Sequence, residues 1–350
     1  MREGFARLGD RSQGSSKFLG RSIRVGVVAL LLLHAGCSQL IAPDASRPIE
    51  KHVEPESGRE YLLYRPSRYD RANAWPLIVL CHSGFPDSAS KQVQEWATLA
   101  EEYGFVVIAP KIEATRGALS RSGAQEPNAL KLDEAGILSS VRHVRAGHNI
   151  SEDRMFIQGQ AGGAGSAMFT GLRNREMFRA ISLSQPRFDR GDMADVTVYV
   201  DPYQPVFLNF RGSDVMTGKQ GRECADWLRS YGADLRSQPV GGGNHPQRAI
   251  EFFQDVIRKE PWIHVHAAPS EGANPLSLRF KMSTPVPPSR FRWRFSDGDE
   301  SPVAEPVHVF SKAGKHRVVV TVDLPKLGEH TRYLDVDVPS GTVLPAHGSP

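Results

Sequence analysis

The chain has 350 residues, of which 40% are hydrophobic and 23% are charged. These proportions are ordinary for a globular protein and exclude disorder along the whole chain, while the length suits one large and one small domain. The formal net charge is +4, and residues 1–36, with six basic and two acidic side chains, account for all of it. Because the remainder is nearly neutral, the charge makes no case for nucleic-acid binding, and we expect no nucleic-acid partner.

The first 36 residues have the pattern of an export signal. A basic, Ser/Gly-rich stretch precedes an apolar run over Val25–Leu33, which is too short to span a bilayer and is typical of a signal-peptide core. Next come Ala35-Gly36-Cys37, which resemble the end of a bacterial lipobox, although His34 stands where that motif usually has leucine. The resemblance implies a lipid on Cys37 that anchors the protein to a membrane of the cell envelope. The alternative is an ordinary cleaved signal and a secreted or periplasmic protein.

Residues 37–58 are rich in Pro, Ser and Glu without periodicity and are expected to form a linker. From residue 59 to 260, apolar strand-like runs alternate with amphipathic segments. The predicted strands are 59–66, 75–82, 105–110, 154–159, 178–185 and 205–212, and the predicted helices are 93–104, 133–148, 163–175, 220–234 and 249–259. Strands separated by helices need crossover connections, so the pattern predicts an α/β domain with a mainly parallel sheet covered by helices on both faces. The polar stretch between Pro110 and Leu130 predicts either a loop bordering a cleft or a mobile insertion.

The pattern changes at Pro261, after which short strands and turns follow without a good helix. We expect residues 262–338 to form a separate β domain and residues 339–350, rich in Pro and Gly, to be disordered. Trp293 and Phe295 are two residues apart and therefore share one face of a strand. Asp297-Gly298 is a strong turn signal. Three alternating valines, at 318, 320 and 322, are expected to point inward.

Three short motifs in this region resemble those of polycystic kidney disease (PKD) domains. They are Trp293-x-Phe295-x-Asp297-Gly298, Pro306-x-His308-x-Phe310 and Gly314-x-His316-x-Val318, the last two with Phe and His where the family has Tyr. The resemblance implies a small Ig-like β-sandwich that spaces the chain or presents a partner and performs no chemistry. We expect His308 to be structural rather than a metal ligand.

The stretch Gly159-Gln-Ala161-Gly-Gly163 follows the apolar run that ends at Ile157. Its glycines flank residue 161 at minus two and plus two, which is the spacing of a nucleophile elbow, a strand-to-helix turn at which two backbones nearly touch. The position that an elbow gives to its nucleophile holds Ala161. A glycine-rich turn could instead bind phosphate, but this turn does not follow the first strand, and no Lys-Ser/Thr pair comes after it.

Residues 59–258 resemble the secreted esterase group of the α/β-hydrolases, which includes polyhydroxybutyrate (PHB) depolymerases and feruloyl esterases. The resemblance implies that Asp214, after a strand, is the triad acid, and that His245, after a Gly-rich loop and before the last helix, is the base. Asp214 could alternatively cap the next helix. The resemblance also implies an oxyanion hole built from a backbone N–H of Ser83 or Gly84 and the N–H of Gly162.

Alanine has no oxygen that could attack a carbonyl, and Ser166, about one turn further along the helix, is expected to point into packing. We therefore expect a protein that binds a polysaccharide or an ester-bearing polymer without a serine nucleophile. Two alternatives stay open: an active esterase in which His245 and Asp214 activate water or another serine serves, and a structural surface protein. No cofactor and no metal are expected. Cys81, inside an apolar strand, is expected to be a buried free thiol.

Overall fold

A computed structural model describes residues 48–83, 88–113, 129–213, 215–240, 245–259, 261–270, 272 and 274–339. Several predicted features lie outside the described residues: the signal peptide with Cys37, the oxyanion residue Gly84, the acid Asp214, residues 114–128 of the polar loop, and the tail from residue 340. In the part of the chain that the structure describes, no helix is both long and apolar enough to cross a bilayer.

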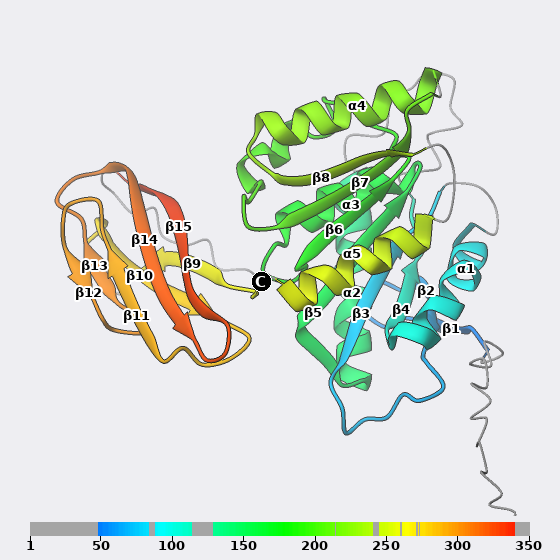
Figure 1. The fold of residues 1–350 in the computed structure, drawn as a ribbon, viewed down its shortest axis with the longest axis horizontal. Coiled ribbons are helices and arrows are strands. Elements are labelled where there is room, and N and C mark those ends of the chain that lie inside the picture. The colour runs from blue at the N-terminus through cyan, green and yellow to red at the C-terminus, as the bar shows by residue number, and fades with distance from the viewer. Residues whose placement is uncertain are drawn as a thin grey trace, which may run out of the picture. The chain divides into compact units, whose positions relative to one another are not determined.

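One eight-stranded sheet organises residues 50–240 (Figure 1). In spatial order its strands are β1 (Glu50–Val53), β2 (Glu60–Tyr64), β4 (Val106–Pro110), β3 (Trp75–Cys81), β5 (Ile150–Gln160), β6 (Ala180–Ser184), β7 (Pro205–Arg211) and β8 (Asp234–Val240). From β4 through β8 every neighbouring pair is parallel, while β1 and β2 join antiparallel at one end. The predicted α/β fold with a mainly parallel sheet is thus confirmed.

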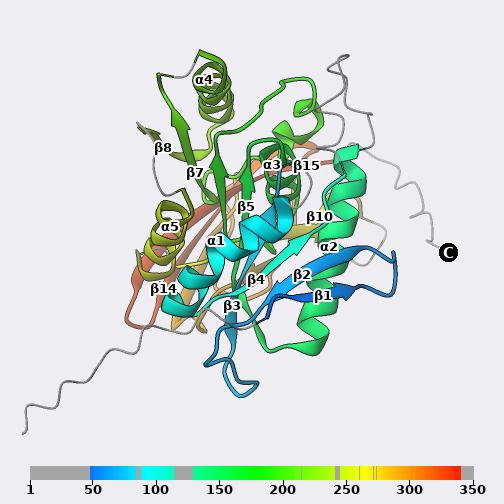
Figure 2. The same cartoon turned by 90° about the vertical axis from the view of Figure 1, so that its right-hand side faces the viewer.

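Helices cover both faces of this sheet (Figures 1 and 2). They are α1 (Ser88–Tyr103), α2 (Ala129–Gly147), α3 (Gly163–Arg173), α4 (Val215–Ser230), α5 (His245–Lys259) and the 3₁₀ helix η2 (Ala194–Tyr199). Apolar residues of α2, α3 and α4 share one core with Leu77 and Val79 of β3, whereas α1 and α5 share the opposite core with Ile78 and Leu80. Because successive strand residues point to opposite faces, a strand buried on both sides must be apolar throughout, as β3 is.

The two outermost strands were not predicted. The linker prediction for residues 37–58 was wrong over Glu50–Val53, because β1 pairs antiparallel with β2 there. Similarly, the helix expected to reach residue 234 ends at Ser230, and β8 begins at Asp234. Both strands lie at the edges of the sheet. Half-buried and exposed residues alternate along β1, and residues 234–237 of β8 are half-buried. Neither strand therefore has the continuous apolar sequence that indicates a central strand.

Both cysteines of the described residues are buried free thiols, Cys81 in β3 and Cys224 in α4. The expectation for Cys81 is therefore confirmed. Burial raises the pKa of the Cys81 thiol well above its ordinary value and that of Cys224 to about 12. Neither thiol is therefore activated as a nucleophile.

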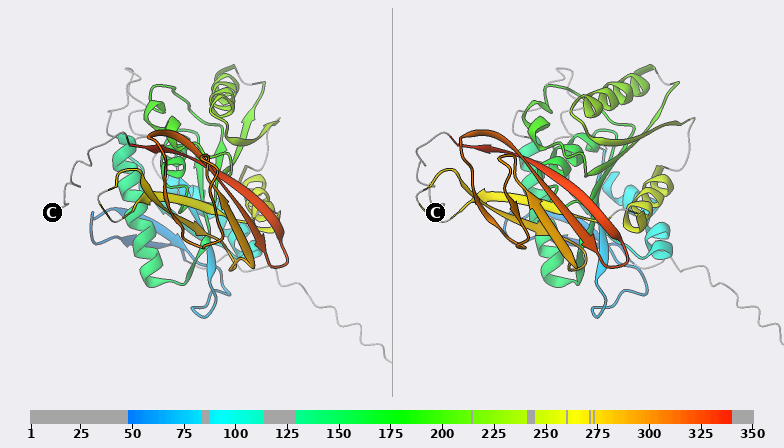
Figure 3. Two further views of the ribbon diagram at one scale, coloured as in Figure 1. Left: turned by 90° about the vertical axis from the view of Figure 1, so that its left-hand side faces the viewer. Right: turned by 60° about the vertical axis from the view of Figure 1, so that its left-hand side comes forward.

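Residues 264–338 form two antiparallel sheets (Figure 3). One contains β13 (Val307–Val309), β10 (Ser277–Ser283) and β9 (His264–Pro269), and the other β12 (Glu300–Ser301), β11 (Arg290–Arg294), β14 (Gly314–Leu324) and β15 (Gly328–Val338). Trp293, Phe295 and the three alternating valines of β14 are buried in one core, as predicted. This architecture is that of the expected Ig-like β-sandwich.

The motif residues of the sandwich are tied together by side-chain contacts. The His308 ring stacks on Phe295 with centroids 3.8 Å apart, and its Nε2 lies 2.8 Å from Oδ2 of Asp297. His316 is also buried, with Nδ1 2.7 Å from the Ser296 hydroxyl and Nε2 2.9 Å from the Lys312 carbonyl oxygen. The two histidines therefore stabilise the turn around Asp297 and the strands that follow it.

Candidate active site

The turn between β5 and α3 has the geometry of a nucleophile elbow. Ala161 adopts a positive φ of 50°, and Gly162, the N-cap residue of α3, has a φ of −61° and a ψ of −34°. A Cβ on Gly159 would lie 2.5 Å from the Cα of Ala164, and a Cβ on Gly163 would lie 2.2 Å from the carbonyl oxygen of Cys81. Real Cβ atoms do not approach backbone so closely, so the turn requires glycine at both positions, as the spacing predicted.

The backbone of Ala161 is held from both sides by residues 184–187. Its N–H donates to the Ser184 carbonyl oxygen at 2.9 Å, and its own carbonyl oxygen accepts from the Arg187 N–H at 3.0 Å. The carbonyl oxygen also accepts from the Ala164 N–H at 3.2 Å. A left-handed conformation costs an L-residue about 1–2 kcal/mol, and these bonds fix it in place. The turn therefore presents a methyl group where an elbow presents its nucleophile.

Two serine hydroxyls near the elbow, one on α3 and one at the end of β6, are buried in packing. Ser166 is 1% exposed, and its hydroxyl donates to Oδ2 of Asp133 at 2.8 Å. Asp133, on α2, is itself fully buried; its Oδ1 accepts from the Glu113 N–H at 2.8 Å and faces the Arg59 guanidinium at 3.3 Å. Ser166 thus anchors α3 to α2 and points away from the elbow, as expected. Ser184, at the end of β6, is also fully buried.

His245, the predicted base, is the first residue of α5 and is half-buried. Its Nε2 lies 2.7 Å from the side-chain amide nitrogen of Gln185, the residue that follows β6. Because an amide N–H can only donate, Nε2 accepts, and the neutral ring carries its proton on Nδ1. Nδ1 is buried and has no partner among the described residues. Burial, followed by the positive charges of Arg211 and Arg248, lowers the pKa of His245, so the ring is neutral near pH 7.

The structure therefore brings Ala161 and His245 to one place, because Gln185 belongs to the same segment 184–187 that brackets the elbow. Asp214, the predicted acid, follows β7 beyond the described residues, so its contact with the ring is not described. Sequence reasoning missed Gln185. The one available signal was its place directly after a buried strand, since the carboxyl ends of parallel strands meet where ligands bind in this class of fold.

The predicted oxyanion loop begins beside the elbow, where Gly163 packs against the backbone of Cys81 and His82. His82 is 8% exposed; its Nε2 accepts from the Ile112 N–H at 3.1 Å, and its Nδ1 lies 2.7 Å from the Ser83 carbonyl oxygen. Burial lowers the pKa of His82, so it is a neutral ring that ties the loop to the end of β4. Among the described residues, the backbone N–H groups of Ser83 and Gly162 have no hydrogen-bond acceptor.

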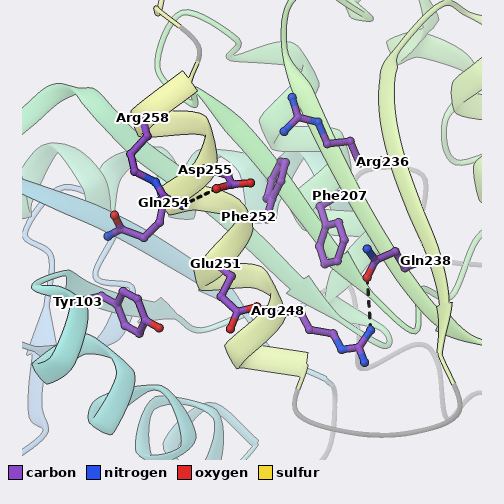
Figure 4. Close-up of a pocket in the computed structure, with 10 residues that line it drawn as sticks. All are labelled: Tyr103, Phe207, Arg236, Gln238, Arg248, Glu251, Phe252, Gln254, Asp255 and Arg258. Atoms are coloured by element: carbon purple, nitrogen blue, oxygen red, sulfur yellow. Dashed lines mark hydrogen bonds and ion pairs between the residues drawn. The ribbon is translucent and has the colours of Figure 1, made fainter.

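Two hollows are lined by residues of the candidate site or of the elements that carry it. One, of about 220 Å³, reaches His82 and is also lined by Lys51, Tyr61 and Lys111. A larger groove, of about 630 Å³, runs between α5 and β8 (Figure 4). Its lining residues are Tyr103, Phe207, Arg236, Gln238, Arg248, Glu251, Phe252, Gln254, Asp255 and Arg258. Arg248 joins this groove to the candidate site, because it bonds Gln238 at 3.3 Å and lies about one helical turn after His245.

Comparison with known proteins yields two family matches. Residues 59–193 match the family model described as esterase PHB depolymerase, and residues 259–336 match the PKD domain. No curated protein sequence matches the chain.

Solved structures similar to the chain include several esterases. A fungal esterase from Rhizomucor miehei is 16% identical with a TM-score of 0.46, over 61% of this chain and 86% of its own. A lipase/esterase from Lactobacillus plantarum is 15% identical with a TM-score of 0.46, over 60% and 98%. Taken with the mainly parallel sheet and the two antiparallel sheets, these matches show an esterase-like α/β-hydrolase fold followed by a PKD domain.

Proposed function

We propose that this protein binds an ester-bearing ligand at the elbow and does not turn it over through a seryl acyl-enzyme. One observation carries the proposal: Ala161 places a methyl group at the head of α3, in the positive-φ conformation of an elbow nucleophile. An acyl-enzyme needs an oxygen or sulfur that attacks the carbonyl, and a methyl group has neither. The oxyanion donors do not depend on that side chain.

Those donors support binding. The N–H groups of Ser83 and Gly162 are without acceptors in the part of the chain that the structure describes, and both lie beside the elbow. A carbonyl oxygen of a ligand would satisfy them. We therefore propose as ligand a polymer that carries ester groups, with an acylated polysaccharide as the leading class.

The alternative of an active esterase needs a base with a free lone pair. Among the described residues, the one hydrogen bond of the His245 ring is the bond from Gln185 to Nε2, the atom that would take a proton from water or from a hydroxyl. This contact opposes the alternative without any reference to Ala161. The remaining alternative, a purely structural surface protein, predicts no ligand effect on the α/β domain at all.

The proposed setting is the cell envelope, with the protein exported and held to a membrane by a lipid on Cys37. The supporting observation is the Ala-Gly-Cys sequence after a signal-like apolar run. Expression with the native N-terminus followed by membrane fractionation tests it. The wild type should sediment with membranes, and Cys37→Ser should move to the soluble fraction; equal distribution of both would remove the anchor from the proposal.

Binding and turnover are tested together on the full chain. With p-nitrophenyl butyrate the wild type should show at most the roughly 10³–10⁴-fold acceleration over water that oxyanion donors and binding alone provide, and its intact mass should not change. Acetylated xylan should raise the melting temperature, and deacetylated xylan should not. His245→Ala should weaken this effect. His330→Ala, which changes a half-buried histidine of the sandwich, should leave it unchanged.

Three results would contradict the proposal. Rapid ester turnover by the wild type that His245→Ala abolishes would make the protein an esterase. A mass increase matching an acyl adduct would reveal a nucleophile. Absence of any stabilisation by acetylated xylan and by a film of poly(3-hydroxybutyrate) would favour the structural alternative, which further predicts that partner capture survives deletion of residues 59–258.

A further inference from the structure

Strained backbone is concentrated at the candidate site. Among the described residues, the non-glycine residues with positive φ are Ala161 (50°), Gln185 (47°) and Lys326 (67°). Lys326 lies in the tight turn between β14 and β15. The other two belong to segments that hydrogen-bond each other, since residues 184 and 187 bond both sides of Ala161. Strain of this kind persists where the surroundings impose it, and it often marks a functional position.

The strain at Gln185 has a second source. Pro186 follows it, and a residue before proline is normally restricted to extended conformations, so a left-handed φ is doubly unfavourable. The backbone N–H of Gln185 donates to the carbonyl oxygen of Asn209, on β7, at 2.8 Å, which fixes this conformation. Its consequence is the direction of the side chain, whose amide reaches the Nε2 of His245 at 2.7 Å.

The hydrogen bond from Gln185 occupies the Nε2 lone pair of His245, the lone pair with which a catalytic histidine accepts a proton. In a serine hydrolase, Nε2 accepts the proton of the nucleophile, while Nδ1–H faces the acid. Here the Gln185 amide donates to Nε2 and selects the same tautomer, with the proton on Nδ1. The geometry of the base is therefore kept, but its accepting atom is already occupied.

We propose that Gln185 is a positioning residue that caps the base: its amide takes the hydrogen-bonding place of a nucleophile at His245 Nε2 and keeps the ring from accepting a proton. This inference rests on the proposed function, because it explains how the site binds without turnover. It adds that two features, the methyl group at Ala161 and the amide at Gln185, separate this site from a working triad, so restoring a hydroxyl alone is insufficient.

The charged groups around the ring support a neutral imidazole. From the described elements, Arg211 of β7 and Arg248 of α5 act on His245, and both oppose its protonation after burial has already done so. A neutral His245 ring keeps a lone pair on Nε2, which can accept the hydrogen bond from the Gln185 amide. Removal of the amide should leave that lone pair to water and make the ring easier to protonate.

The first experiment measures the ring itself. Full-length protein with ¹⁵N-labelled histidine is compared as wild type, Gln185→Ala and Gln247→Ala, with His245→Ala to assign the signals. Gln247→Ala is the matched control, because this residue lies on the same helix and bonds Glu251 and Tyr103. The wild type and the control should show a protonated Nδ1 and an accepting Nε2 near pH 7. In Gln185→Ala the two tautomers should mix, and the titration midpoint should rise toward the ordinary value of about 6.5.

The second experiment measures p-nitrophenyl butyrate turnover in Ala161→Ser, Ala161→Ser/Gln185→Ala and Ala161→Ser/Gln247→Ala. General-base assistance contributes roughly 10²–10⁴-fold, so the variant that also lacks the amide should exceed the other two by about 100-fold or more. An Ala161→Ser variant as fast as the double variant would overturn the cap and leave the binding proposal intact. If poor folding silences the double variant, the Gln185→Ala spectrum decides, and an unchanged tautomer and midpoint would overturn the inference.

Rapid turnover by the wild type has a different meaning. It would refute the proposed function, and it is measured without any change at Gln185. The failures of the two proposals are therefore distinguishable.

Discussion

Replacing Gly136 with alanine should destabilise the α/β domain, although alanine is the better helix former. Gly136 lies inside α2, where a Cβ would come within 2.1 Å of Nε and 2.3 Å of Cδ of Arg59. Arg59 crosses the helix at this glycine to reach the buried Asp133 at 3.3 Å, and it also donates to the Lys111 carbonyl oxygen at 2.8 Å. The added methyl must push the Arg59 side chain aside, and we expect this shift to draw the guanidinium away from the carboxylate.

The magnitude follows from two opposing effects. Alanine gains about 1 kcal/mol over glycine in a helix interior. Breaking a buried ion pair by removing one partner costs about 3–5 kcal/mol, and the low end applies because Asp133 keeps its bonds from Ser166 and from the Glu113 N–H. The net loss is about 2 kcal/mol, which lowers the melting temperature of a domain of this size by about 4–8 °C.

Urea unfolding followed by circular dichroism measures the loss, with Gly147→Ala as the matched control. Gly147 ends the same helix, and a Cβ added there would face open space with nothing within 4 Å, so its replacement should be neutral or slightly stabilising. In an Arg59→Ala background, Gly136→Ala should become stabilising, because the obstacle is gone. Equal stabilisation by both glycine replacements in the wild-type background would refute this reasoning.

Three further predictions concern the site. Ala161→Gly should raise the free energy of unfolding by about 1 kcal/mol, because glycine adopts a positive φ without strain; a less stable variant in urea titration would contradict the elbow geometry. Gly159→Ala should cost at least about 1–3 kcal/mol, because its Cβ meets the Ala164 backbone at 2.5 Å; unchanged urea stability would show that the turn is looser. The melting temperature should fall as the pH drops from about 7 to 5, because the unfolded chain protonates His82 near pH 6.5 while burial keeps the folded ring neutral. Replacing His82 with asparagine should flatten this slope, and an unchanged slope would assign the effect to other groups.

The parts of the fold that sequence predicted are those governed by local chemistry. Central strands such as β3 are buried on both faces and must be apolar throughout, so each one can be recognised in the sequence as a continuous run of apolar residues. The elbow is visible because two backbones meet there and only glycine fits, which fixes Gly159 and Gly163 whatever residue lies between them. In the sandwich, the alternation of β14 follows directly from the two-residue period of a strand.

The features that sequence did not predict depend on distant partners. The charged Asp133 is read most simply as a surface residue of an amphipathic helix, yet it is fully buried, because Arg59 and Ser166 reach it from 74 and 33 residues away. Nothing in the sequence around Gln185 distinguishes it from other polar residues. Its position depends on a backbone hydrogen bond to β7 and on a side-chain contact with His245, 60 residues further along the chain. No local pattern records such long-range bonds.

The reactivity of the two buried thiols can be used to measure unfolding of the α/β domain. Cys81 and Cys224 both belong to the core on the α2–α3–α4 side of the sheet, whereas residues 262–338 contain no cysteine. In a Cys37→Ser background, alkylation by iodoacetamide can therefore proceed in the described residues only when the α/β domain opens. The rate at which the alkylated protein forms, followed by mass spectrometry, measures how often this core opens to solvent, independently of the sandwich.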